Sequence, residues 1–324
     1  MKAWRAHAYG AYKDVLHFED IEAPSAPVDG AVVAVKSAAL NFPDLLAIAG
    51  KYQVKAPLPF VPGIEAAGVI TTAGPKSRYK AGDRVIASTL WGAFAEQLAV
   101  PDAMLFPIPP EMSDDDAASL LVTYQTSYFA LIHRATLQKG ETLLVHGGAG
   151  GVGISAIQIG KALGATVIAT AGADDKLDVC KKAGADHAIN YKDEDFVAAV
   201  QKLTGGRGAD VVYDPVGGDV FDKSLKCIAW EGRLLVIGFA SGRIPEIAAN
   251  KILLKNISII GLFWGQYMIR DPQKIRDAHD ALCAMYRDKQ IAPMVWKRFP
   301  LAELPDALGA LESRASHGKV VVAP

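Results

Sequence analysis

The sequence predicts an α/β protein built from a β-rich, barrel-like module and a doubly wound parallel sheet. Its length of 324 residues corresponds to about two domains. In the first hundred residues, short alternating runs such as 31–35 and 66–72 are separated by turn signals, which favours short strands. Beyond Gly140 the chain alternates between buried-strand runs and helical stretches, as in a parallel sheet covered on both faces.

Composition excludes several classes of partner and protein. Lys and Arg total 34 against 35 for Asp and Glu, a net charge of -1, so neither nucleic acid nor an anionic membrane surface is an expected partner. No apolar run approaches the roughly 20 residues that span a bilayer, and the N-terminus has no signal-peptide pattern. The three cysteines lie too far apart for a disulfide framework, which favours a reducing compartment and a cytoplasmic location.

The parallel sheet is expected to contain six strands. Three consecutive aspartates, Asp114 to Asp116, predict the start of a helix that leads into it. The predicted strands are 142–146, 166–170, 187–190, 209–214, 233–237 and 257–261, and the helices between them are 152–163, 174–183, 194–203, 218–228 and 245–253. This pattern predicts a doubly wound dinucleotide-binding domain.

The C-terminal tail returns to mixed structure, with helices at 272–287 and 301–312 and short strands at 295–299 and 319–322. It is too small to be a domain alone, so we expect it to pack on the first module. The predicted division is therefore 1–122 with 265–324 for the β-rich domain, and 123–264 for the dinucleotide-binding domain.

A glycine-rich turn follows the first strand of the parallel sheet. Residues 143–153 form a buried-strand run, a turn with five glycines in seven residues, and the start of a helix. Glycines let a pyrophosphate approach the backbone, and the amides opening the helix offer it unpaired donors. The cofactor-binding candidates here are Gly148, Gly150, Gly151, Val152 and Gly153.

The choice of cofactor is expected to be made after the second strand, where an NAD-selective site carries an acid for the ribose 2′-hydroxyl. Ala171 and Gly172 stand there instead, and Lys176 offers a charge for a 2′-phosphate, so NADP is favoured over NAD. Asp174 and Asp175 argue the other way, unless they serve only the start of the next helix.

Motifs along nearly the whole chain carry a family resemblance. They are 41–44 (Asn-Phe-Pro-Asp), 50–52, 62–68, 81–85, 92–96 and the 147–153 turn. The chain resembles the medium-chain dehydrogenase/reductase superfamily, and within it the zinc-independent quinone oxidoreductases related to zeta-crystallin. The resemblance implies a GroES-like catalytic domain made from both chain ends, a Rossmann domain between them, NADPH as the cofactor, and a homodimer paired at the edge strand 257–261.

The resemblance also implies roles for individual residues. Asn41 and Thr126 would lie near the nicotinamide, and Gly172, Lys176, Tyr191 and Arg314 would surround the 2′-phosphate. Tyr52 matches the proposed proton donor of related enoyl thioester reductases, although a packing role on its loop is an equal alternative. Phe239 and Phe263 are candidates for lining a flat apolar pocket beside the cofactor, with core packing as the alternative.

No metal is expected. Zinc alcohol dehydrogenases need a Cys near position 41, a Gly-His-Glu near 63 and further cysteines, whereas this chain has Asn41, Gly63-Ile64-Glu65 and no Cys before Cys180. Without a Lewis acid, the acceptor must spread the incoming negative charge over its own conjugated system.

The predicted function is therefore an NADPH-dependent reductase of quinones or α,β-unsaturated carbonyls, with Asn41 and Tyr52 as catalytic candidates. Two alternatives stay open. One is an enoyl thioester reductase acting on CoA-bound or carrier-bound acyl chains. The other is an NADPH-binding, crystallin-like protein without turnover.

Overall fold

The computed structural model describes residues 1–324, which divide into two compact units. Unit 1 contains Met1–Val122 and Pro293–Pro324, and unit 2 contains Thr123–Ala292. The first division agrees with the expected one, but the second lies at 292 rather than at 264. The segment 265–292 stays in unit 2 because Gln125 donates to the carbonyl of Ile275 and the Ala292 N–H donates to Gln158.

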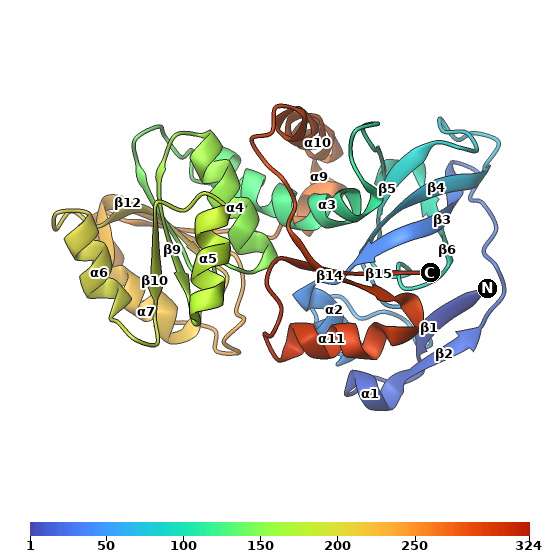
Figure 1. Ribbon diagram of the computed structural model, residues 1–324, viewed down its shortest axis with the longest axis horizontal. Helices are drawn as coiled ribbons and strands as arrows, with labels where there is room; N and C mark the ends of the chain where they lie inside the picture. Colours follow the sequence, from blue (N-terminus) through green and yellow to red (C-terminus); the bar gives the residue numbers. More distant parts are fainter. The chain divides into compact units, whose positions relative to one another are not determined.

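Unit 2 contains a six-stranded parallel sheet in the order β10-β9-β8-β11-β12-β13. Its strands are β8 (Thr142–Val145), β9 (Thr166–Ala171), β10 (His187–Asn190), β11 (Ala209–Asp214), β12 (Ile228–Val236) and β13 (Ser258–Gly261). The strand order reverses between β8 and β11, so the crossovers on either side place their helices on opposite faces. Figure 1 shows α4 (Gly151–Ala162) and α5 (Asp174–Lys182) on one face, and α6 (Phe196–Leu203) and α7 (Gly218–Cys227) on the other. The predicted doubly wound domain is confirmed.

The strands of this sheet could be predicted from apolar runs in the sequence because their side chains are buried. All four residues of β8 are buried, and the core on the α6 and α7 side is built from side chains such as Leu144, Val212 and Leu234. On the other side α4 approaches the sheet closely, since a Cβ at Gly160 would lie 2.6 Å from the Leu143 side chain. Glycine at 160 therefore sets the distance between α4 and β8.

The remaining helices of unit 2 lie before β8 and after β12 in the chain. They are α8 (Ala249–Lys255), α9 (Gly265–Arg270) and α10 (Pro272–Arg287), while α3 (Asp114–Tyr128) contains the division between the units and continues into a π-helical turn, η2 (Phe129–Arg134). The three aspartates predicted to start a helix lie in the first turn of α3, where negative charge is favoured. None of the helices has the length and hydropathy that crossing a membrane requires.

Unit 1 is β-rich, as predicted. A seven-stranded sheet has the order β14-β15-β3-β4-β5-β7, with β6 also paired to β3, and a separate hairpin joins β1 to β2. The strands are β1 (Lys2–Ala6), β2 (Leu16–Asp20), β3 (Gly30–Ala39), β4 (Glu65–Ala73), β5 (Arg84–Ser88), β6 (Gln97–Pro101), β7 (Leu105–Pro107), β14 (Val295–Pro300) and β15 (Lys319–Ala323). Short helices complete the unit: α1 (Tyr12–Val15), α2 (Phe42–Ile48), η1 (Asp102–Met104), η3 (Leu301–Glu303) and α11 (Leu304–Glu312).

The last part of the C-terminal tail, Pro293–Pro324, packs on the first module as expected, whereas the helix predicted at 272–287 belongs to unit 2. Strand β15 lies between β14 and β3, pairing with β3 through Val321 and Val322. Both chain termini therefore lie in unit 1 (Figure 1). A single core joins the two segments, in which Val320 and Leu304 pack with Val33 and Ile70.

Candidate functional site

The glycine-rich turn of unit 2 connects β8 to α4 through a tight reversal. Gly147 has a φ of +60°, and the Gly150 N–H donates to the Gly147 carbonyl at 2.9 Å. Gly153 is required by close approach, because a Cβ there would lie 2.3 Å from that same carbonyl oxygen and 2.7 Å from Gly148 Cα. The turn is thus fixed by backbone contacts that only glycine permits.

This turn leaves the start of α4 open to an anion. Gly150 is exposed, and Gly151 and Val152 are half-buried, so the first amides of a twelve-residue helix reach the surface beside the turn. No acidic residue lies in the first turn of α4. Free amides at the positive end of a helix dipole fit a pyrophosphate.

Three predicted residues for the 2′-phosphate gather at the carboxyl end of β9. Gly172 follows the strand directly, and the ring of Tyr191 packs against it. Lys176 lies half-buried in the first turns of α5. Asp174, one of the two acidic residues whose charge disfavours a phosphate here, accepts a hydrogen bond from the Asn190 amide at 3.3 Å.

A buried histidine, His146, lies directly before the glycine turn. His146 bridges Thr170 Oγ1 at 3.0 Å and Ser224 Oγ at 2.8 Å, and burial lowers its pKa to about 3. The imidazole is therefore neutral, and it links β8, β9 and α7 through its two hydrogen bonds.

A buried carboxyl, Asp214, stands at the end of β11. It accepts the N–H groups of Val216 and Gly217, and burial raises its pKa.

Unit 1 contains a buried polar cluster of four side chains: Asn41, Asp44, Glu65 and Lys319. The Lys319 ammonium donates to Glu65 Oε1 at 2.9 Å, to Asn41 Oδ1 at 2.7 Å and to the Leu40 carbonyl at 3.0 Å. The Asn41 amide in turn donates to Glu65 Oε1 at 2.8 Å. These bonds compensate an ion pair that would otherwise be costly to bury.

Asp44 completes the cluster from the first turn of α2. Its Oδ2 accepts the Asn41 N–H at 2.7 Å, while Oδ1 is buried without a hydrogen-bond partner. Burial raises the pKa of the Asp44 carboxyl to about 7, in spite of the Asn41 N–H and the Lys319 charge, which lower it. Tyr52 follows in the loop after α2, half-buried, and its phenol pKa is raised by burial and then by the Asp44 charge.

The same cluster does not fit a zinc ion. Asn41 stands where the zinc alcohol dehydrogenases carry a Cys, and Ile64 stands where they carry the His of Gly-His-Glu. Asn41 and Glu65 are both bonded to the Lys319 ammonium, and the second Glu65 oxygen accepts the Val122 N–H at 2.9 Å. The Lys319 ammonium therefore already occupies the oxygen atoms that a zinc ion would need. Nowhere in the chain do three or more His, Cys, Asp or Glu side chains gather in a way that could hold a metal.

The other predicted residues are distributed between the units. Asn41, Tyr52 and Arg314 belong to unit 1, where Arg314 is exposed with a φ of +58° after α11. Thr126 is half-buried on α3 in unit 2. Phe239 and Phe263 also belong to unit 2. Phe239 packs near Gly217, and Phe263 is 44% exposed, so core packing does not account for it.

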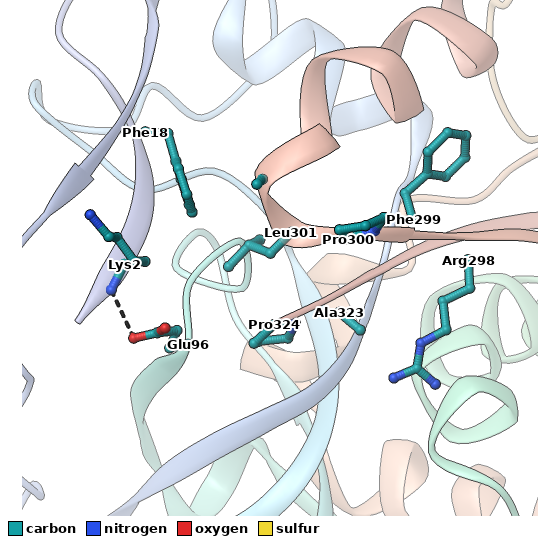
Figure 2. A pocket seen from close by; sticks show the side chains of 10 residues that line it. Lys2, Phe18, Glu96, Arg298, Phe299, Pro300, Leu301, Ala323 and Pro324 are labelled. Carbon is teal, nitrogen blue, oxygen red and sulfur yellow. Dashed lines mark hydrogen bonds between the residues drawn. The ribbon is translucent and has the colours of Figure 1, made fainter.

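A hollow of about 500 Å³ in unit 1 contains none of the predicted residues. Lys2, Phe18, Glu96, Leu301 and Pro324 are among its lining side chains (Figure 2). Its charged groups are engaged within the protein, since the Lys2 N–H donates to Glu96 and the Lys2 ammonium to Asp20. This hollow is separate from the candidate site.

Sequence reasoning gave no role to Asp44, Glu65 or Lys319. Two of the three carried a signal: Lys319 begins a strand of valines, and Glu65 stands in the apolar run 64–68. A charge inside a buried strand requires a partner. The sequence did not indicate which partner, because Glu65 and Lys319 are 254 residues apart.

Comparisons with known proteins cover both units. The family described as "Alcohol dehydrogenase GroES-like domain" matches residues 28–110, and the one described as "Zinc-binding dehydrogenase" matches residues 151–282. A "Quinone oxidoreductase-like protein 2 homolog" from Nematostella vectensis is 40% identical over 90% of this chain and 80% of its own length.

Two solved structures extend the comparison over the full chain. The Escherichia coli quinone oxidoreductase complexed with NADPH is 30% identical, with a TM-score of 0.92, and the match covers 100% of both chains. The CurK enoyl reductase is 26% identical, with a TM-score of 0.89 and 99% of both chains covered.

Proposed function

Because the chain belongs to the quinone oxidoreductase family of the medium-chain dehydrogenase/reductase superfamily, we propose that it is an NADPH-dependent reductase of quinones or α,β-unsaturated carbonyls. One observation in each unit supports the proposal: the glycine-rich turn that opens α4 in unit 2, and the buried cluster of unit 1, in which the Lys319 ammonium binds the oxygen atoms that a metal ion would need. The first feature fits a dinucleotide. The second favours an acceptor that stabilises its own negative charge.

NADPH supplies a hydride when it is bound. The amides of Gly151 and Val152 would hold its pyrophosphate, with Gly148, Gly150 and Gly153 allowing close approach. Lys176, Tyr191, Gly172 and Arg314 would hold the 2′-phosphate, and Thr126, Asn41, Phe239 and Phe263 would lie toward the nicotinamide. The contact between Tyr191 and Gly172 supports the first group, because it shapes a surface next to Lys176.

Tyr52 is the proposed proton donor to the reduced acceptor. Its phenol pKa is raised, so the group stays protonated at neutral pH and can give its proton only as negative charge develops on a substrate beside it. Its half-buried position limits competition from water. Asn41 orders the start of α2, the helix that precedes Tyr52, through its bonds to Asp44 and Lys319.

A homodimer in the cytoplasm is part of the same proposal. Strand β13 lies at the end of its sheet, and the side chains of Leu253, Leu254 and Ile269 in unit 2 are each at least two-thirds exposed. Three buried cysteines, none of them in a disulfide, support a reducing compartment. Sedimentation analysis tests the dimer, with a monomer at micromolar concentration as the contrary result, and cell fractionation tests the location.

An acceptor screen tests the function. Oxidation of NADPH and of NADH is followed with benzoquinone, phenanthrenequinone, an alkenal and crotonyl-CoA. Reduction of a quinone or the alkenal with NADPH preferred is the expected result. Turnover of crotonyl-CoA alone would identify an enoyl thioester reductase; one structural neighbour is named an enoyl reductase. Binding of NADPH with no turnover of any acceptor would favour a crystallin-like role.

A further inference from the structure

The buried cluster of unit 1 contains one carboxyl that its single cation does not neutralise. An ammonium group has three protons to donate. Lys319 uses them on Glu65, Asn41 and the Leu40 carbonyl, and none reaches Asp44. The Lys319–Glu65 pair is already neutral, so an ionised Asp44 would leave an uncompensated charge among buried groups.

Asp44 is also poorly bonded for a charged group. It is 0% exposed, and only Oδ2 has a partner, the Asn41 N–H. The buried Oδ1 has none. Burying an ionised carboxylate with one oxygen unbonded is costly, whereas the neutral form removes most of that cost.

We propose that Asp44 carries its proton in the resting protein and that losing this proton makes Tyr52 a weaker proton donor. Asp44 is then a positioning residue that acts through Tyr52 and touches no substrate. The inference rests on the proposed function of Tyr52, and its two tests separate the state of Asp44 from that function.

The groups that face Asp44 determine when it ionises. They are the Asn41 N–H, Lys319 on β15 and Glu65 on β4. Tyr52 lies in the loop after α2, where its N–H donates to the Leu46 carbonyl of that helix at 3.1 Å. Burial is the largest influence and raises the Asp44 pKa to about 7, the Asn41 N–H and Lys319 oppose it, and Glu65 adds to it. The carboxyl therefore changes charge within the physiological range.

The effect on turnover follows from the proton balance. After hydride has reached an enone, the enolate takes one proton from the Tyr52 hydroxyl, whose O–H bond breaks, and the resulting tyrosinate takes a proton from solvent. An ionised Asp44 places a second negative charge near that tyrosinate and raises the phenol pKa. Turnover is therefore expected to fall as pH rises through the titration of Asp44.

Infrared difference spectroscopy reads the state of Asp44 without any activity. Wild-type protein and Asp44→Asn are compared from about pH 5 to about pH 9, a range that brackets the shifted carboxyl. The expected result is a neutral-carboxyl band in the wild type that is lost around pH 7 and is absent from Asp44→Asn. If that band is missing at every pH, Asp44 is ionised throughout and the proposal is overturned.

The pH profile of kcat for an enone reads the link to Tyr52. The wild type is expected to lose rate on the alkaline side, and Asp44→Asn to lose that decline while keeping NADPH affinity. Asp44→Ser, which keeps an oxygen for the Asn41 N–H, is the second variant should the first not fold. Asp14→Asn removes the same charge from an exposed position of unit 1 and should retain the wild-type profile.

The outcomes are distinct. An unchanged alkaline decline in Asp44→Asn overturns the link even if the infrared band titrates as expected. A wild-type protein that reduces no enone overturns the proposed function of Tyr52, and with it the link, while the infrared titration still reports whether Asp44 carries the proton.

Discussion

The ring of Tyr191 packs so closely over Gly172 that a Cβ atom at position 172 would lie 2.5 Å from the Tyr191 hydroxyl oxygen. Tyr191 is 47% exposed, so it can swing away from an added methyl group at little cost to folding. This contact links the end of β9 to the loop after β10, next to Lys176 on α5.

Gly172→Ala is expected to weaken NADPH binding by about 1 kcal/mol, roughly fivefold, by displacing the Tyr191 ring, with little change in the melting temperature. Titration calorimetry measures the affinity. The matched control is the same change in a Tyr191→Ala background, where the methyl meets no ring and should cause no further loss. A full additional loss in that background would show that Tyr191 is not the group affected.

Lys176→Ala is expected to weaken NADPH by about tenfold to a hundredfold while leaving NADH almost unchanged, because only the 2′-phosphate needs a cation there. Dissociation constants for both cofactors test this. Lys182→Ala, an exposed change in the last turn of the same helix, is the control and should affect neither. Equal weakening of both cofactors would move the phosphate site elsewhere.

Gly153→Ala is expected to destabilise the protein by about 1–3 kcal/mol, since the added Cβ meets the backbone of Gly147 and Gly148, which cannot move aside as a side chain can. Chemical denaturation measures the loss. Gly150→Ala is the matched control, because residue 150 has a φ of -82° and its Cβ would lie 3.4 Å from the nearest atom. Equal stability of the two variants would contradict the close approach.

His146 predicts a specific acid sensitivity. Its pKa is about 3 in the folded protein and 6.5 without the fold, so the unfolded chain binds more protons between these values. The contribution of neutral His146 is complete above about pH 6.5 and is lost as pH falls toward 3. Asp44 titrates in the opposite sense, so wild type must be compared with a variant.

The expected result for His146→Gln is a melting temperature that falls less steeply on acidification than that of the wild type, measured by calorimetry. The two curves should converge as the pH is lowered. His187→Gln, at an exposed position, is the control and should run parallel to the wild type. Parallel curves for His146→Gln would mean that the fold does not lower the pKa of this imidazole.

The parallel sheet could be predicted because buried strands form apolar runs between glycines, and five of its six strands were placed within a residue or so. β12 was the exception. It begins at Ile228 rather than at Arg233, since Glu231 takes a φ of +59° and the pairing with β11 shifts register there, which interrupts the apolar pattern. Such a bulge depends on the neighbouring strand, and the residues alone do not determine it.

The glycine turn could also be predicted, because its chemistry is contained in eleven consecutive residues. The cluster around Asp44 could not. Its members come from α2, β4 and β15, and the role of each depends on which of the others it bonds by hydrogen bonds. The second boundary between the units lies at 292 rather than at 264, since bonds from Gln125 and Gln158 hold residues up to 292 in unit 2.

The insertion of β15 between β14 and β3 has a consequence for how the chain is made. Unit 2 is one continuous segment, so every strand it pairs is available once residue 292 has left the ribosome. Unit 1 needs residues 319–323 before β3, which already pairs with β4 and β6, gains β15 and before Glu65 gains its lysine. During synthesis unit 2 is thus expected to mature first, while unit 1 lacks β15 and the ammonium group that neutralises Glu65 until residue 319 has been made.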